Sequence, residues 1–211
     1  MLFRSSGSES LASTNSPNPG TLPVELSRFD ATLDGEDAVR LTWTTATETG
    51  NAGFRVQRKA GGGGEGSWTT VGSVEGKGTT TTPTSYRYAD EGLPYEADRL
   101  TYRLKQVDTD GSTSYSKEVT VSREVKEAEL LGTYPNLAQQ RATLRYAVPE
   151  WQDVKIYLYD ILGRRVRTVV DGKREGRHER QLDTSRLASG VYFLRLRADG
   201  ATKTQKLTVV R

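Results

Sequence analysis

Val39-Arg40-Leu41-Thr42-Trp43 carries apolar side chains at every second position. Because successive side chains of a β-strand point to opposite faces, this alternation predicts a strand with one buried and one solvated face. It places Trp43 on the buried face. Residues 54–58 and 102–105 repeat the pattern, and no segment between residues 22 and 121 has a helical period.

Turn residues separate these predicted strands. Asp34-Gly35 and Asp110-Gly111 tolerate positive φ angles, which tight turns require. Weaker strand signals lie around residues 24–29, 68–71, 85–88 and 114–121. Roughly seven strands within about 100 residues favour a two-sheet antiparallel sandwich.

The C-terminal part predicts a second unit of the same kind. Residues 142–148 alternate until Pro149, which we expect to end that strand, and a later strand is expected to close at Asp171-Gly172. Asp199-Gly200 is a strong hairpin signal between the two final strands. The sequence therefore predicts an all-β fold with two consecutive antiparallel β-sandwich domains of the immunoglobulin-like type.

Charged residues with little strand signal mark the boundary between the two units. We expect a flexible tail or linker over residues 1–20, a first sandwich over 21–121, a linker over 122–129 and a second sandwich over 130–211. Residues 1–20 contain no continuous apolar run, so they predict no signal peptide and suggest the C-terminal piece of a longer protein. No stretch approaches the roughly 18 apolar residues of a membrane helix.

The net charge of +3 is unevenly distributed. Residues 1–128 contain 14 Lys and Arg against 18 Asp and Glu, whereas residues 129–211 contain 16 against 9. In the sequence these basic residues are scattered along alternating strands rather than clustered with aromatic residues. The pattern therefore does not predict nucleic-acid binding.

The residues needed for catalysis are scarce. The chain has no Cys and a single His, His178, so Cys/His pairs and the usual zinc sites are not available. Asp108-Thr109-Asp110-Gly111 resembles the start of a calcium loop, but Val119 occupies the position where that loop needs a Glu. We expect a hairpin turn there, a solvent-facing His178, no metal, no cofactor and no enzymatic activity.

Two other features have simple alternatives. The glycine-rich residues 61–66 lack the Lys-Ser/Thr of a phosphate-binding loop and predict a hairpin loop. Trp43, Trp68 and Trp151 are candidate sugar-stacking platforms, although Trp43 falls on the buried side of its strand.

Several segments of the first unit resemble the fibronectin type III-like module found near the C-termini of exported Bacteroidetes-type proteins. These segments are residues 22–26, 41–43, 48–58 and 102–108. The resemblance implies that the ring of Tyr102 is packed and that its hydroxyl bonds to backbone.

A second resemblance covers about 80 residues and ends at the last one. Tyr134-Pro135-Asn136 and residues 142–146, 154–166, 187–192 and 206–211 look like the type A C-terminal sorting domain of the type IX (Por) secretion system. Leu137 departs from the family, which usually has Pro after the Asn. The resemblance implies a protein that is secreted or attached to the cell surface after crossing the periplasm. It implies as partners an outer-membrane translocon, a sortase and possible surface polysaccharide or lipopolysaccharide.

From this resemblance we expect recognition of the sorting signal by a small set of residues and cleavage in the linker. The recognition candidates are Gly163, Gly190, Val191, Tyr192, Lys206 and Arg211. The processing linker is Ser122, Arg123, Glu124, Val125, Lys126, Glu127 and Ala128. Gly163 and Gly190 have the alternative of being simple turn glycines. For the first sandwich, the alternative to a spacer is a carbohydrate-binding or protein-binding adhesion module.

Overall fold

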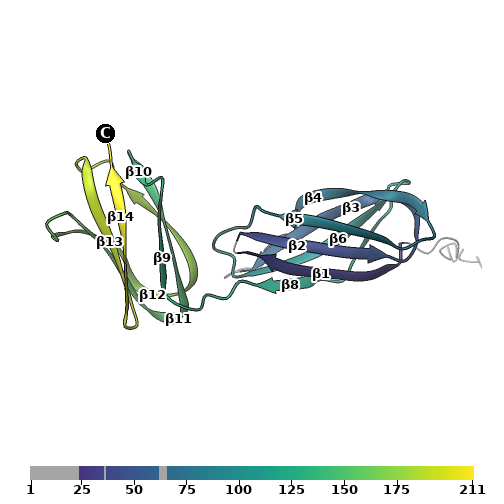
Figure 1. The fold of residues 1–211 in the computed structure, drawn as a ribbon, viewed down its shortest axis with the longest axis horizontal. Coiled ribbons are helices and arrows are strands. Elements are labelled where there is room, and N and C mark those ends of the chain that lie inside the picture. The colour runs from purple at the N-terminus through teal and green to yellow at the C-terminus, as the bar shows by residue number, and fades with distance from the viewer. Residues whose placement is uncertain (1–23, 36, 62–65) are drawn as a thin grey trace, which may run out of the picture.

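The computed structural model describes residues 24–35, 37–61 and 66–211, and its regular structure is entirely β. The predicted tail over residues 1–20 and most of the glycine-rich loop lie outside this part (Figure 1). No helix in the described ranges is long and apolar enough to span a bilayer. The strands are β1 (Leu26–Asp34), β2 (Ala38–Thr45), β3 (Glu48–Gly61), β4 (Thr69–Thr80), β5 (Thr84–Asp90), β6 (Arg99–Asp108), β7 (Thr113–Tyr115), β8 (Val119–Ser122), β9 (Glu129–Tyr134), β10 (Leu137–Ala138), β11 (Arg141–Tyr159), β12 (Arg165–Asp183), β13 (Gly190–Ala198) and β14 (Ala201–Val209).

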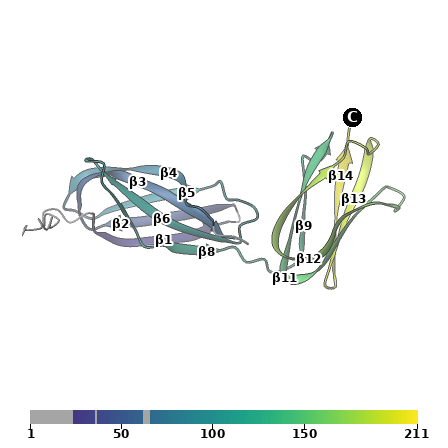
Figure 2. The same ribbon diagram turned by 180° about the vertical axis from the view of Figure 1, so that it is seen from behind.

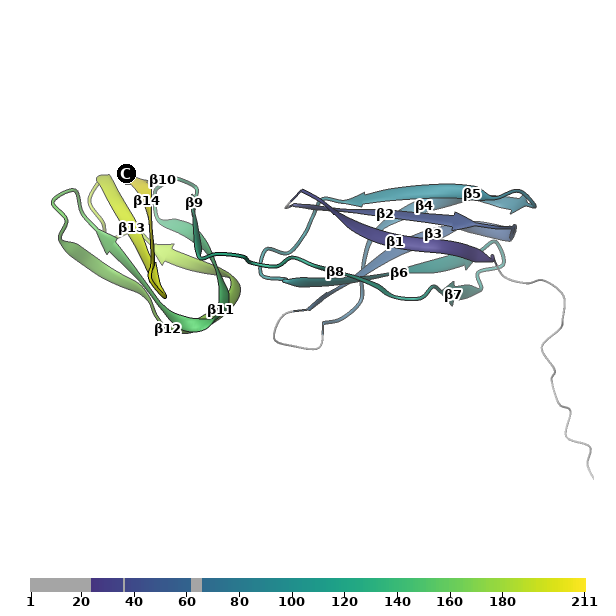
Figure 3. The ribbon, with the colours of Figure 1, turned by 60° about the horizontal axis from the view of Figure 1, so that its bottom comes forward.

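The first eight strands form the predicted sandwich of two sheets (Figure 3). One sheet has the order β1-β2-β5, and the other has the order β4-β3-β6-β7 with β8 also paired to β6. The predicted alternation holds along β2, where Val39, Leu41 and Trp43 are at most 1% exposed. The Trp43 ring stacks on Tyr86 at 5.5 Å between ring centroids, so Trp43 belongs to the core and is not a sugar platform.

The second sandwich is built around β11 and β12, which form one long, curved antiparallel pair within a single six-stranded sheet (Figure 2). Residues 143–147 of β11 pair with β9, whereas residues 154–159 pair with β13. The expected strand end at Pro149 was wrong, because pairing resumes at Gln152 after a bulge. A bulge needs no ladder donor at the extra residues, so it accommodates the missing N–H of proline.

The expected end at Asp171-Gly172 was also wrong, because β12 continues to Asp183. Gly172 and Gly176 have φ angles of 136° and 79°, which let the strand bend without a side-chain clash. The hairpin at Asp199-Gly200 was predicted correctly: Ala198 faces Ala201, and both turn residues have positive φ, as a type I′ turn requires.

One strand pair departs from the predicted antiparallel arrangement. β10 pairs with β14 in parallel, with Leu137 opposite Thr208. β9, β10 and β14 belong to one six-stranded sheet of order β10-β14-β13-β11-β12, in which β9 also pairs with β11. The chain leaves β9 and crosses to the free edge of β14, where β10 and β14 run in the same direction. The strand signal of a two-residue segment is too short to reveal such a crossing from the sequence.

Each sandwich encloses its own cluster of buried apolar side chains. The first cluster includes Leu41, Phe54 and Leu104, and the second includes Leu144, Ile156 and Leu194. Between the two sandwiches, β8 ends at Ser122 and β9 begins at Glu129.

Candidate functional site

The first sandwich contains a buried carboxylate, Glu48, that is 1% exposed. Its oxygens accept hydrogen bonds from the side chains of Thr45, Asn51 and Tyr86 and from the backbone N–H of Lys77, at 2.5 to 3.0 Å. Burial alone raises the pKa of Glu48, but these four hydrogen bonds together outweigh it and hold the pKa below its ordinary value. A carboxylate with all its acceptor sites engaged is a structural tie between strands, not a general acid.

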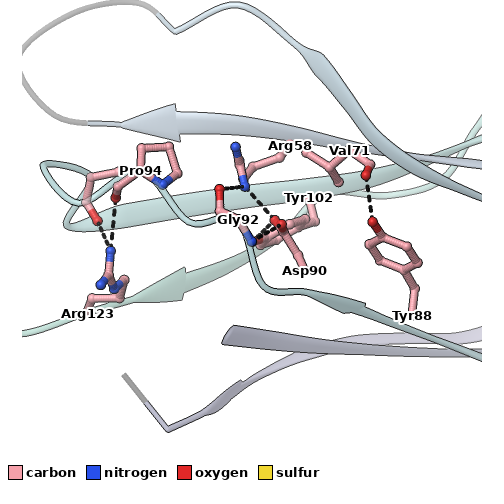
Figure 4. A network of polar contacts seen from close by, with 9 residues as sticks. Arg58, Val71, Tyr88, Asp90, Gly92, Pro94, Tyr102 and Arg123 are labelled. Atoms are coloured by element: carbon pink, nitrogen blue, oxygen red, sulfur yellow. Dashed lines mark hydrogen bonds and ion pairs between the residues drawn. The ribbon is translucent and has the colours of Figure 1, made fainter. Parts of the chain in front are cut away.

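A second buried carboxylate, Asp90, is held by Arg58 and Tyr102 (Figure 4). Arg58 Nη1 lies 2.7 Å from Asp90 Oδ2, and the Tyr102 hydroxyl donates to the same oxygen at 2.9 Å. The expected bond from Tyr102 to backbone was therefore wrong. A buried carboxylate at the end of β5 is a stronger acceptor than a carbonyl. Burial, and then the charge of Asp90, raise the pKa of Tyr102 above its ordinary value.

Trp68 and Trp151 do not form a platform on which a sugar could stack. The Arg103 guanidinium lies 4.0 Å from the Trp68 ring centroid and 4.1 Å from that of Tyr115, so cations already cover these rings. Trp151 is 65% exposed, in the bulge of β11. It lies in a different sandwich from Trp68, so the two rings do not make one platform.

The suspected calcium loop is a hairpin turn. Asp110 Oδ1 accepts the Ser112 N–H at 2.8 Å, Asp108 Oδ2 accepts the Ser112 hydroxyl, and Gly111 has a φ of 87°. Within the described ranges, no group of three or more His, Cys, Asp or Glu side chains is placed to hold a metal ion. The His178 ring stacks on Tyr146 at 5.1 Å on β12, where its Nε2 lies 2.8 Å from Glu175 O.

Three motifs of the second sandwich, namely Tyr134-Pro135-Asn136 and residues 187–192 and 206–211, meet at the end that lies opposite the linker, where β10 and the C-terminus lie together (Figure 1). Thr208 N–H donates to Asn136 O at 3.1 Å, which ties the Tyr-Pro-Asn segment to the final strand. Gly190 and Val191 pair with Val209 and Thr208 on the neighbouring strand. Residues that lie between 17 and 72 positions apart in the sequence therefore form one local surface.

Gly163 lies in the exposed turn between β11 and β12. Its φ of 75° favours glycine, and its N–H donates to Asp160 O at 3.0 Å. The Asp160 carboxylate also accepts the N–H groups of Leu162 and Arg164. The turn glycine alternative is therefore the simpler account of Gly163, although the turn displays Ile161 and Leu162 at 70% and 72% exposure.

Tyr192 has a structural role. Its side chain is 8% exposed, and its hydroxyl donates to Ala188 O at 3.0 Å, the backbone contact that we had expected of Tyr102. Gly190 keeps an ordinary strand backbone, and a Cβ added there would meet no atom within 4 Å. The turn glycine alternative therefore has no support from the backbone at Gly190.

Replacing Tyr192 with Phe is expected to lower the free energy of unfolding of the second sandwich by about 1 kcal/mol, because Ala188 O loses its donor while the ring packing is kept. Urea unfolding of the full chain measures the change. The matched control is Tyr157→Phe, on the solvent side of β11, with an expected change within about 0.5 kcal/mol. Equal losses in both variants would contradict a special role for the Tyr192 hydroxyl.

Two basic candidates lie on or beside the final strand. Lys206 is exposed on β14 opposite Phe193, and Arg211 Nη2 donates to Ser185 O at 3.3 Å. The structure thus brings together five of the six predicted recognition residues along β13, β14 and the chain end. Only Gly163 lies on a separate turn.

The predicted processing linker is unevenly accessible. Ser122 belongs to β8, and Arg123 is 5% exposed, with its N–H donating to Asp98 O at 2.7 Å and its guanidinium donating to Pro94 O at 3.0 Å (Figure 4). Burial lowers the pKa of Arg123. At the other end Ala128 is 6% exposed. The accessible part of the linker is therefore residues 124–127.

Sequence reasoning missed the junction between the sandwiches. The Tyr95 ring lies 4.9 Å from the Arg145 guanidinium and 5.8 Å from that of Arg177, and Glu96 Oε1 accepts the Glu179 N–H at 3.0 Å. The loop between β5 and β6 thus contacts β11 and β12. No local pattern predicts contacts between residues that lie 50 or more positions apart.

Residues 132–210 match the family model described as the secretion system C-terminal sorting domain. The crystal structure of dimeric latent PorU from Porphyromonas gingivalis aligns at 14% identity with a TM-score of 0.34, over 90% of this chain and 20% of PorU. The crystal structure of the chicken CNTN1 FN1-FN3 domains aligns at 14% identity with a TM-score of 0.42, over 90% of this chain and 67% of the FN1-FN3 chain. A search of curated proteins gave no match.

Proposed function

We propose, from the premise that residues 132–210 belong to the family of secretion system C-terminal sorting domains, that this chain is the C-terminal region of an exported surface protein. The second sandwich directs transport by the type IX (Por) system and attachment to the cell surface. Its partners are the outer-membrane translocon and a sortase, with surface polysaccharide or lipopolysaccharide as the anchor. The matched family is a sorting domain and not a catalytic one.

The observation that carries this proposal is that three of the family motifs meet at one end of the second sandwich. Asn136, Gly190 and Thr208 meet through backbone contacts there, and Arg211 lies beside Ser185. A folded signal has to be displayed as a surface, and this end lies opposite the linker that carries the cargo (Figure 2). The fold alone would not support the function.

We propose domain limits of 21–121 and 130–211, supported by the two separate cores. The first sandwich then acts as a spacer, and its buried carboxylates act as ties within it. Its alternative function, as a carbohydrate-binding or protein-binding module, gains no support from Trp68, whose ring is covered by Lys59 and Arg103.

Cleavage by the sortase is proposed within residues 124–127. A protease needs an extended and accessible backbone, and Arg123 and Ala128 are buried on either side of this stretch.

A reporter joined behind a signal peptide to residues 122–211 is expected outside the cell in a host with this secretion system. The matched control joins the same reporter to residues 24–121, which contain the first sandwich without the sorting domain, and is expected to stay in the periplasm. Reporter activity in the medium and in the periplasm measures the distribution. Retention of the intact 122–211 fusion inside the cell would overturn the proposal.

A further inference from the structure

The solvent face of the β12-β11-β13-β14 sheet gathers basic and aromatic side chains that are dispersed in the sequence. Tyr157 faces Arg195, Tyr159 faces Phe193, and Phe193 faces Lys206. Residues directly opposite each other on neighbouring strands share one face of the sheet. The alternate residues, such as Ile156 and Leu194, are fully buried and point to the core, so this set points to solvent.

The aromatic rings of this face hold two of its arginines in place. The Arg165 guanidinium lies 5.1 Å from the Tyr157 ring centroid, and that of Arg195 lies 5.0 Å from the Tyr159 centroid. The two tyrosine rings contact each other edge to face at 6.3 Å. A guanidinium that stacks through its flat side keeps its N–H donors free at the edge, where they match a carboxylate in a bidentate pair.

The charge on the face is mainly of one sign. Its basic side chains are Lys155, Arg165, Arg195, Arg197 and Lys206, and none of these five has an ion-pair partner within 4.0 Å in the described part of the chain. Its acidic residues are Asp153, which lies opposite Lys173, and Asp171, which lies opposite Lys155. Both pairs are near the bend of the long strands. The half of the face around Tyr159 and Phe193 therefore presents positive charge that is not neutralised within the sheet.

We propose that this face docks a protein of the export machinery that presents carboxylate groups. The assignment of this partner to the export machinery rests on the proposed function. Arginines around a partly exposed aromatic side chain, here Phe193 at 37%, are typical of protein interfaces, in which Tyr and Arg are enriched. The guanidinium groups occupy the tyrosine rings, so these rings are poorly placed for stacking of sugars or bases. The apolar area that this face could insert into lipid is small, since Tyr157 and Tyr159 are only partly exposed and Phe193 is 37% exposed.

A binding titration tests the charge recognition without any need for export. Purified full chain is titrated at low salt with fluorescent poly-L-glutamate and, separately, with vesicles that contain lipopolysaccharide. The variant Arg165→Glu/Arg195→Glu is expected to bind poly-L-glutamate at least about tenfold more weakly. The matched control Arg141→Glu/Arg180→Glu carries the same charge change on exposed positions in the opposite halves of β11 and β12, away from Arg165 and Arg195. Its binding is expected to stay within about twofold.

Unfolding midpoints of both variants establish that they fold. If both variants bind poly-L-glutamate equally weakly, the loss of binding follows from the change in net charge alone, and the proposal is overturned. Binding of the vesicles in preference to poly-L-glutamate would overturn it in favour of an anionic lipid surface.

Cross-linking in a host with the secretion system tests the class of partner. A photoreactive residue at Thr204, which faces Arg195, is expected to give an adduct with a protein. This adduct should be lost in Arg165→Glu/Arg195→Glu and restored when the acidic residues mapped at the contact are changed to Lys. An adduct with lipopolysaccharide, or export of the chain without a protein adduct, would overturn the docking surface while leaving the proposed function intact. Failure of the unmodified chain to leave the cell would count against the proposed function. The titration would still show whether this face binds carboxylate groups.

Discussion

Replacing Glu48 with Ala is expected to lower the free energy of unfolding of the first sandwich by about 3–5 kcal/mol. The substitution leaves the Tyr86 hydroxyl, the Asn51 amide and the Lys77 N–H without the acceptor that each has in the folded chain. These groups belong to β3, β4 and β5, and Glu48 is only 1% exposed, so bulk water is a poor substitute for the carboxylate. A loss of this size removes a large part of the stability of a small domain.

Urea unfolding of the full chain, followed by tryptophan fluorescence, measures this loss, because Trp43 reports the first core. The matched control Glu75→Ala removes an exposed carboxylate on β4 and is expected to change the free energy by no more than about 0.5 kcal/mol. The transition of the second sandwich should be unchanged in both variants. A loss below about 1 kcal/mol in Glu48→Ala would mean that the buried network has little net effect.

The pH dependence of stability gives a second test of Glu48. Its folded pKa is held below the ordinary value, so its ionised form adds stability above the pKa of the unfolded chain. This contribution is lost as the pH falls through the folded pKa. The stability difference between the native chain and Glu48→Gln is therefore expected to be constant near neutral pH and to shrink below about pH 4.

The sequence predicts the strands of this protein better than it predicts their ends. Alternation places Trp43 and Leu194 in the cores because burial follows the period of the side chains. Pro149 and Gly172 were expected to end strands, yet both lie in strands that bend and continue. A bend and an end need the same residues, and only the pairing of β11 with β12 distinguishes them.

The buried carboxylate and the basic face could not be predicted from the sequence, because both depend on contacts between residues that are distant in the chain. Nothing in the sequence around Glu48 indicates that it is buried, but Tyr86, 38 residues away, makes it a buried tie. The basic residues of the second sandwich looked scattered because alternation separates them in the sequence. Strand register then brings Arg195 beside Tyr157, so the surface is a property of the sheet.

Deletion of Lys206–Arg211 is expected to reduce export of the reporter joined to residues 122–211 to background, because it unfolds the sorting domain. The deletion removes Leu207 and Val209, which are 0% and 1% exposed in the core, and takes from β10 its pairing partner. Loss of one such side chain costs about 2–5 kcal/mol, so the loss of both approaches the whole stability of a small domain. The truncated fusion should be retained in the periplasm and cleaved there by proteases.

The decisive comparison uses point variants that keep the core. Lys206→Ser with Arg211→Ser removes both basic groups and leaves Leu207 and Val209 in place, so the domain should fold with an unchanged unfolding midpoint. If these side chains are read by the translocon, export falls at least about tenfold although the domain is folded. Export at the native level would assign them no role in recognition and would mean that the final strand is needed only as part of the sheet. The same strand therefore has two separable tasks, since its buried residues complete the core while its exposed residues are free to carry a signal.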